Sequence, residues 1–360
     1  MKKLLLLLLC FLVLQAMAVP FTGVTVSSLQ VEGRTILLGL DLLQPRLSWK
    51  LQSSERGVMQ TAYEILVASS PDKLAAGEGD VWNSGVVKSE ASINVVYSGR
   101  PLQNFRYYWW KVRVHTTKGI SPWSNPALWS MGILDPSAWK ARWIGLDTFN
   151  RNDRPHDDYT RLAARYIRKN ITTPKRVARA TAFISGLGLY ELYINGRKVG
   201  DAVLAPTVKE YNKVVPYNTL DVTGYLKKGP NAIGVILGNG RFFSMRDYRG
   251  EKKWRTGIPP VTGYGYPKLL LQVRVEYSDG TTAMITTDDS WKVSDNGPIL
   301  ANSEFDGEEY DANKEWKDWA QPWFNDRQWR NAELVAAPAS RVESQLNENI
   351  KVKEVLKPVS

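Results

Sequence analysis

The chain has 360 residues, enough for two or three domains of ordinary size, and a formal net charge of +11 at pH 7. Its Lys and Arg residues are dispersed and no nucleic-acid-binding motif accompanies them, so we expect no nucleic-acid partner. The single cysteine, Cys10, lies in an apolar N-terminal run, which excludes disulfides and the usual zinc sites from the rest of the chain.

Residues 1–18 have the pattern of a secretory signal peptide. Two lysines precede an apolar run from Leu4 to Leu14, and Ala16-Met17-Ala18 supplies small residues at the cleavage positions. The apolar run is too short for a comfortable membrane span, and no other stretch is long and apolar enough to cross a bilayer. We therefore expect cleavage near Ala18 and a periplasmic or extracellular location.

Residues 22–135 contain short strand-like segments that turn-rich stretches separate. Arg46–Trp49, Ala62–Val67 and Tyr107–Val114 are rich in aromatic and aliphatic residues. This spacing predicts a fibronectin type III or immunoglobulin-like sandwich. The tryptophans on these segments are expected to fill its core rather than to bind a ligand.

Residues 139–335 predict a second and larger β-sandwich. Leu189–Ile194 alternates with the two-residue period of a half-buried strand, and Asn195-Gly196 then marks a tight hairpin. A second strand, Ile233–Leu237, ends in Gly238-Asn239-Gly240. We expect the two asparagines of these turns to face one concave end of the sandwich. The fold class that the whole pattern predicts is therefore all-β.

Candidate binding residues are polar side chains, since hydroxyl groups of a ligand suit Asn amides, carboxylates and backbone N–H groups. The candidates are Asn195, Asn239, Arg241, Glu308 and Asp311. For the two asparagines, ordinary turn chemistry is an equally good explanation. The chain has only two histidines, His115 and His156, and it lacks a nucleophile-elbow, P-loop or dinucleotide-binding motif.

Several ordered stretches carry a resemblance to a known family. GLYELYINGRKVGD, VPYNTLDVT and NAIGVILGNG resemble the β-sandwich module near the N-terminus of bacterial α-L-rhamnosidases of glycoside hydrolase family 78. QTAYEILVAS, VWNSG and YYWWKVRV resemble the domain that precedes that module. The resemblance implies a fibronectin type III-like domain followed by a jelly-roll, galactose-binding-like sandwich. It also implies that residues 336–360 are a linker or strand leading to a downstream domain.

The resemblance bears on catalysis and on metal binding as well. Glycoside hydrolysis needs two carboxyls that flank the scissile bond, and in this family they lie on an (α/α)₆ barrel that has no counterpart here. We therefore assign no catalytic residue. Some modules of this kind bind L-rhamnose through Ca²⁺, but Ile194 precedes Asn195, so no Asp-Asn pair supplies metal ligands there. The expectation is no cofactor, with Ca²⁺ as the alternative.

Three functional hypotheses remain open. The first is the secreted, non-catalytic, carbohydrate-binding part of an α-L-rhamnosidase-related protein that recognises L-rhamnose-containing plant or bacterial glycans. The second is a truncated α-L-rhamnosidase whose catalytic barrel is missing, so that whether the protein is an enzyme stays undecided. The third is a scaffold or adhesion module without a sugar site.

Overall fold

The computed structural model describes residues 23–147, 154–155, 160–243, 264–304, 307–338 and 341–358. Within it the chain divides into two compact units, one of residues 1–37 and 42–131 and the other of residues 38–41 and 132–360. The expected signal peptide and His156 lie outside the described residues.

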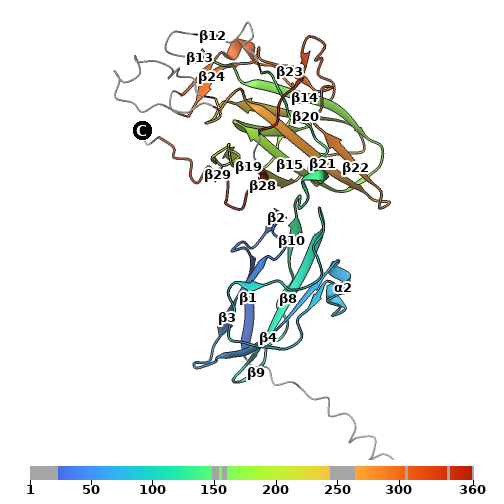
Figure 1. Ribbon diagram of the computed structural model, residues 1–360, viewed down its shortest axis with the longest axis vertical. Coiled ribbons are helices and arrows are strands. Elements are labelled where there is room, and N and C mark those ends of the chain that lie inside the picture. The colour runs from blue at the N-terminus through green and yellow to red at the C-terminus, as the bar shows by residue number, and fades with distance from the viewer. Residues whose placement is uncertain are drawn as a thin grey trace, which may run out of the picture. The chain divides into compact units, whose positions relative to one another are not determined.

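The regular secondary structure of the described residues is almost entirely strand, which confirms the all-β prediction (Figure 1). The exceptions are α2 (Pro71–Ala75) and the 3₁₀ helices η1 (Pro136–Ala138), η2 (Thr223–Tyr225) and η4 (Ala312–Lys314). No helix among the residues described here has the length and apolar character needed to span a bilayer.

The first ten strands run as far as residue 131. They are β1 (Val24–Val31), β2 (Leu37–Leu40), β3 (Arg46–Ser53), β4 (Gln60–Ala68), β5 (Trp82–Asn83), β6 (Val87–Lys88), β7 (Val95–Val96), β8 (Tyr107–Thr116), β9 (Gly119–Ile120) and β10 (Ala127–Met131). One sheet of the first unit has the order β1-β3-β7, and the other contains β10-β8-β4-β5 with β6 on β4 and β9 on β8.

Strand β8 shows how the sequence builds this unit. Its residues alternate strictly between half-buried and buried, and Trp110, Val112 and Val114 point into the core. Beyond β9, the hydroxyls of Ser121 and Ser124 accept hydrogen bonds from the amides of Val114 and Val112, at 3.0 and 3.1 Å. Side chains thus satisfy backbone donors along this edge of β8.

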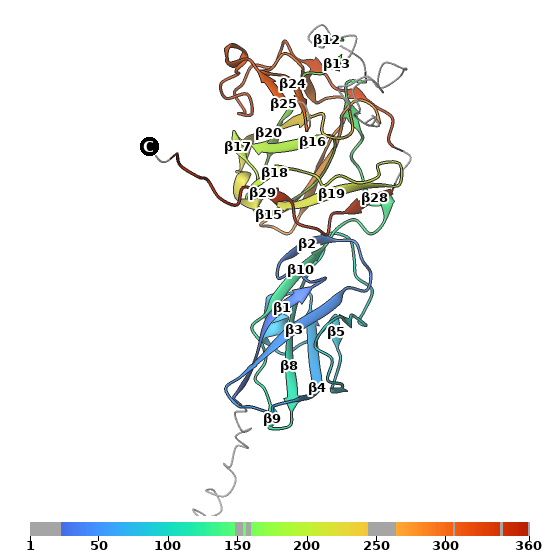
Figure 2. The same cartoon turned by 90° about the vertical axis from the view of Figure 1, so that its left-hand side faces the viewer.

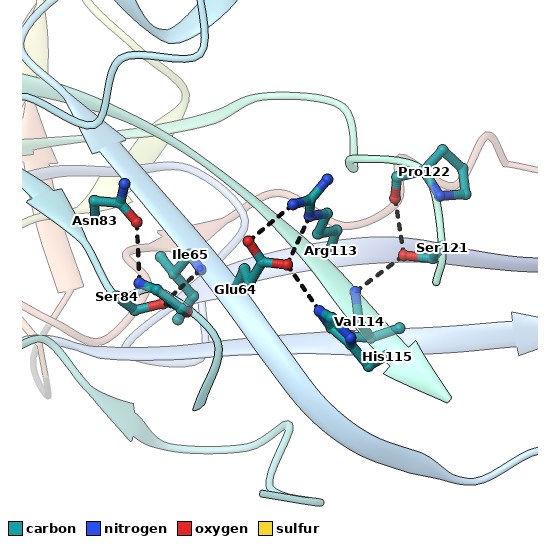
Figure 3. A network of polar contacts seen from close by, with 10 residues as sticks. Glu64, Ile65, Asn83, Ser84, Arg113, Val114, His115, Ser121 and Pro122 are labelled. Atoms are coloured by element: carbon teal, nitrogen blue, oxygen red, sulfur yellow. Dashed lines mark hydrogen bonds and ion pairs between the residues drawn. The ribbon is translucent and has the colours of Figure 1, made fainter. Parts of the chain in front are cut away.

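An ion-pair network lies on the opposite side of β8 from that core (Figure 3). Glu64 of β4 pairs in register with Arg113 of β8 and accepts two hydrogen bonds from its guanidinium group, both 2.9 Å. Nε2 of His115 lies 2.7 Å from the same carboxylate. The Arg113 guanidinium group also stacks over the ring of Trp123, 4.7 Å from its centroid. These contacts bind neighbouring strands together through a bidentate, part-buried pair.

The second unit contains residues 38–40 of β2 and the remaining strands. They are β11 (Ile144–Gly145), β12 (Arg154–Pro155), β13 (Thr160–Arg161), β14 (Arg165–Thr173), β15 (Val177–Leu187), β16 (Leu189–Ile194), β17 (Arg197–Lys198), β18 (Ala202–Leu204), β19 (Val214–Asp221), β20 (Gly229–Gly238), β21 (Lys268–Tyr277), β22 (Thr282–Thr286), β23 (Lys292–Ser294), β24 (Ile299–Ser303), β25 (Gly307–Tyr310), β26 (Arg330–Asn331), β27 (Glu333–Leu334), β28 (Arg341–Ser344) and β29 (Ile350–Lys351).

Two sheets of this unit enclose one apolar core. The larger has the order β27-β11-β21-β15-β19-β28, with β22 paired to β21, and the other has the order β17-β16-β20-β14-β23-β26. Ile184 and Val273 of the larger sheet belong to the same buried cluster as Ile167 and Val235 of the other sheet. Burial of such side chains from both sheets supplies the main stabilisation of a sandwich.

The segment expected as a linker or exit strand, residues 336–360, contributes to the second unit. Strand β28 pairs in parallel with β19, and β29 pairs with β18. Three short strand pairs, β12–β13, β18–β29 and β24–β25, lie outside the two main sheets, and Figure 2 shows β16 and β20 between the last two pairs. This arrangement positions the candidate site.

Candidate functional site

Asn195 forms the expected hairpin turn, and its side chain is used within the fold. Ile194 pairs with Arg197, so Asn195 and Gly196 are the two loop residues, with φ of 51° and 77°. Positive φ at both positions is the requirement of a type I′ turn. The amide donates to the carbonyl of Tyr225 and to Oδ1 of Asn231, at 2.9 and 2.8 Å, and its oxygen accepts from the Ala232 amide at 2.9 Å.

The expectation that Asn195 and Asn239 face one end of the sandwich is wrong. Strands β16 and β20 are antiparallel, with Leu189 opposite Gly238 and Ile194 opposite Ile233. The turn after β16 therefore lies at the far end of the pair from the turn after β20. Six residues of β16 separate them, which is about 20 Å of extended strand. Antiparallel pairing is the physical reason, because neighbouring strands then end at opposite edges.

Asn239 is fully buried and joins β20 to β24. Its amide donates to the carbonyls of Asn302 and Leu162, at 2.8 and 3.3 Å, and its backbone N–H donates to Oδ1 of Asn302 at 2.7 Å. These backbone partners fix the orientation of both side-chain amides. Oδ1 of Asn239 and Nδ2 of Asn302 are then left buried without a partner among the described residues. Unpaired buried polar atoms are uncommon and need an explanation.

A groove of about 510 Å³ lies beside this asparagine pair. We call it the hairpin groove, and it is lined by Ala164, Leu189, Tyr190, Glu191, Val203, Leu204, Ile236, Gly238, Gly240, Ile299, Asn302, Ser303, Glu304, Gly307 and Glu308. Strands β16 and β20 provide one part of its wall, β18 another, and the β24–β25 hairpin a third. Its volume lies within the range of small-molecule sites.

The hairpin groove combines aliphatic surface with carboxylates. Leu204 is 41% exposed on its wall, near Leu189 and Ile236. Glu308 is exposed and lies opposite Asn302 across the hairpin. Glu304 accepts a hydrogen bond from Nε of Arg241 at 2.8 Å, so Arg241 reaches the groove through this ion pair. Burial, together with Tyr310 and Glu308, raises the pKa of the Tyr166 phenol nearby.

Asp311 lies outside the groove lining and has a structural role. It is the N-cap of η4, where its carboxylate accepts hydrogen bonds from the backbone and side-chain nitrogens of Asn313, both 3.0 Å. As for metals, no group of three or more His, Cys, Asp or Glu side chains in the described part of the chain is placed to hold an ion.

The candidates thus separate into three groups. Glu308 lines the groove directly, whereas Asn239 and Arg241 support its wall through Asn302 and Glu304. Asn195 and Asp311 belong to turns elsewhere. Sequence reasoning did not propose Asn302 or Leu204 as site residues, because only the pairing of distant strands brings them to the groove.

The fold and this groove define a protein of two β-sandwich units, the second of which carries a site of ligand size. Residues 26–135 match the family model described as the Rha78A-like N-terminal immunoglobulin domain, and residues 175–354 match the alpha-L-rhamnosidase N-terminal domain. The chain therefore belongs to the α-L-rhamnosidases of glycoside hydrolase family 78 and corresponds to their N-terminal region. This confirms the resemblance read from the sequence.

Individual relatives agree with this membership. An alpha-L-rhamnosidase of Formosa agariphila is 36% identical over 322 residues, covering 86% of this chain and 33% of the relative. One from Alteromonas is 33% identical over 311 residues, covering 84% and 32%. The solved alpha-L-rhamnosidase of Dictyoglumus thermophilum superimposes with a TM-score of 0.84 at 37% identity, covering 94% of this chain and 37% of that one. The chain thus spans between about a third and less than half of the length of the curated relatives it matches.

Proposed function

We propose that this chain is the non-catalytic, carbohydrate-binding part of a secreted α-L-rhamnosidase-related protein, and that the hairpin groove binds an L-rhamnose-containing glycan. The observation that carries the proposal is the composition of the groove wall. Exposed aliphatic side chains lie there beside the exposed Glu308 carboxylate and the side chain of Asn302.

The chemistry of a 6-deoxy sugar fits such a wall. Its methyl group and one ring face are apolar and suit Leu189 and Leu204, while its hydroxyls donate to carboxylates and accept from amide N–H groups. Family membership supports the choice of sugar, because the relatives are named as α-L-rhamnosidases. Affinity for one small sugar is expected between micromolar and millimolar, since each hydroxyl contact replaces a contact with water.

Calorimetric titration with L-rhamnose tests the proposal. Glu308→Gln removes a charged acceptor, and we expect affinity to fall about tenfold. The matched control is Glu309→Gln, because successive residues of a strand point to opposite faces and Glu309 does not line the groove. Equal rhamnose affinity in both variants and in the parent chain would refute the groove assignment. Repeating the titration with EDTA tests whether Ca²⁺ takes part.

A second candidate function rests on exposed aliphatic residues on the groove wall and the strand beside it. Val203 and Leu204 of β18 and Ile350 of β29 are 38%, 41% and 57% exposed, and their strands pair with each other. Such a patch suits contact with another protein domain, as in a scaffold or in a longer rhamnosidase. Two results together would favour this alternative. The chain would fail to bind rhamnose, and Leu204→Asp would abolish its association with a rhamnosidase catalytic domain.

Export is the remaining part of the proposal. The charged start, the apolar run from Leu4 to Leu14 and Ala16-Met17-Ala18 support signal cleavage. N-terminal sequencing of the protein recovered from a bacterial periplasm or medium should give Val19 as the first residue. Recovery of the intact Met1 form from the cytosol alone would contradict it.

A further inference from the structure

A second cleft lies at the β23–β26 edge of the second unit, and no comparison assigns it a role. It encloses about 620 Å³, and its aromatic walls are Trp316, Phe324 and Trp329. We call it the aromatic cleft. Its polar lining includes Asp295, Gln328 and Arg330. It shares no lining residue with the hairpin groove.

The aromatic walls are packed against one another and are therefore pre-formed. The ring centroids of Trp316 and Trp329 are 4.8 Å apart, and those of Phe324 and Trp329 are 5.7 Å apart. Trp329 is buried, whereas Trp316 and Phe324 are half-buried and keep part of their surface open. Rigid aromatic surface costs a ligand little ordering entropy, which favours binding.

Arg168 of β14 holds the loop that carries Phe324. Its side chain is fully buried, forms an ion pair with Asp326, and donates to the carbonyl of Gln321 at 2.9 Å. The guanidinium group also lies 5.3 Å from the centroid of the Phe324 ring. Both sides of the loop around Phe324 are thereby fixed to a central strand.

The cleft contains a buried acceptor without a partner. Asp295 is 7% exposed, and its Oδ2 has no hydrogen-bond partner among the described residues. Its Oδ1 lies 3.9 Å from a guanidinium nitrogen of Arg330. An unpaired buried carboxylate oxygen is uncommon, and this carboxylate belongs to a residue that lines the cleft, so Asp295 keeps acceptor capacity there.

We infer that the aromatic cleft is a second carbohydrate site, which takes a neutral pyranose unit. The C–H groups of one sugar face pack on the electron-rich rings of Trp316 and Phe324, and a ring hydroxyl donates to Asp295. Arg330 already balances the charge of this carboxylate, so a neutral hydroxyl donor fits better than a second cation. Gln328 offers a further donor and acceptor at the rim. The inference is independent of the proposal for the hairpin groove.

Nuclear magnetic resonance of the full chain with labelled tryptophan indoles tests this inference. The probes are L-rhamnose, D-glucose and D-galactose, each titrated to about 100 mM, which exceeds the millimolar dissociation constants expected for single sugars. We expect at least one sugar to shift the indole N–H signals of Trp316 and Trp329. Asp295→Asn should lower the affinity for that sugar about tenfold, and Gln328→Ala should lower it about fivefold.

The controls separate this site from the hairpin groove. Asp289→Asn makes the same charge change at an exposed position that lines neither site and should leave the indole shifts unchanged. Glu308→Gln should also leave them unchanged. The inference is overturned if no sugar shifts these indoles, if choline chloride shifts them and the sugars do not, or if Asp295→Asn binds like the parent. Should Asp295→Asn not fold, unchanged affinity in Gln328→Ala overturns it.

Discussion

The side-chain amide of Asn195 donates a hydrogen bond to Oδ1 of Asn231 at 2.8 Å. Asn231 is fully buried, and its own amide nitrogen donates to the carbonyls of Lys227 and Gly229, at 2.7 and 2.9 Å. The hairpin turn after β16 is therefore attached to the start of β20 by a chain of two side-chain amides. Asn195, which the sequence pattern suggested as a sugar ligand, therefore stabilises the sandwich.

The first prediction follows from this pair. Asn195→Gly keeps positive φ but deletes the amide, so we expect the free energy of unfolding to fall by about 1–3 kcal/mol. Asn195→Ala should cost about 1 kcal/mol more, because a Cβ is strained at φ of 51°. Urea denaturation measures both, with Asp318→Gly as the control, since Asp318 has φ of 60° on an exposed loop. If the Asn195→Gly variant were as stable as the parent chain but no longer bound rhamnose, Asn195 would again be a candidate ligand residue.

Arg168 provides the second prediction. Arg168→Met removes one partner of a buried ion pair and the donor to Gln321, and we expect a loss of about 3 kcal/mol in unfolding free energy. The exposed Arg327→Met is the matched control and should change stability by less than about 0.5 kcal/mol. Equal unfolding midpoints for the two variants would show that the loop around Phe324 does not depend on Arg168.

The third prediction concerns pH and the first unit. The Arg113 hydrogen bonds, with a smaller contribution from His115, hold the pKa of Glu64 below its usual value of about 4.3. A carboxyl whose pKa is lower in the folded state stabilises the fold above its unfolded pKa, and this stabilisation is lost as the pH falls through the folded pKa. Glu64→Gln should therefore destabilise the first unit by about 1 kcal/mol at pH 7 and much less at pH 2.

This pH effect is measured by urea unfolding followed through amide resonances of β4 and β8 at both pH values. The control is Glu78→Gln, which changes an exposed carboxyl of the same unit that forms no ion pair among the described residues. A Glu64→Gln penalty that stays constant from pH 7 to pH 2 would contradict the role of its charge.

The fourth prediction concerns activity. The purified chain should not release rhamnose from an aryl α-L-rhamnoside, because hydrolysis needs an acid and a base or nucleophile on either side of the bond. In the hairpin groove, Glu304 forms an ion pair with Arg241. The family model that residues 175–354 match describes the N-terminal domain of α-L-rhamnosidases. Turnover well above background that Glu308→Gln abolishes would move catalysis into this sandwich.

Local sequence chemistry predicted the elements of this fold well. Asn195-Gly196 specified a type I′ turn, and the alternation of Tyr107–Val114 specified a strand with one buried face, because both signals depend only on neighbouring residues. The motif order also identified the family correctly. These properties are encoded within a few residues of each other, so the sequence alone determined them.

The composition of the sites depended on tertiary structure. Strand pairing reverses β20 against β16, which moves Asn239 away from Asn195 and toward Asn302, a residue 63 positions later. The aromatic cleft likewise requires Asp295 and Trp329, which the pairing of β23 with β26 brings together. A periodic pattern reports which face of a strand is buried but not which strand lies beside it. The contacts that place side chains around a ligand are between distant residues, and only the packed sandwich decided them.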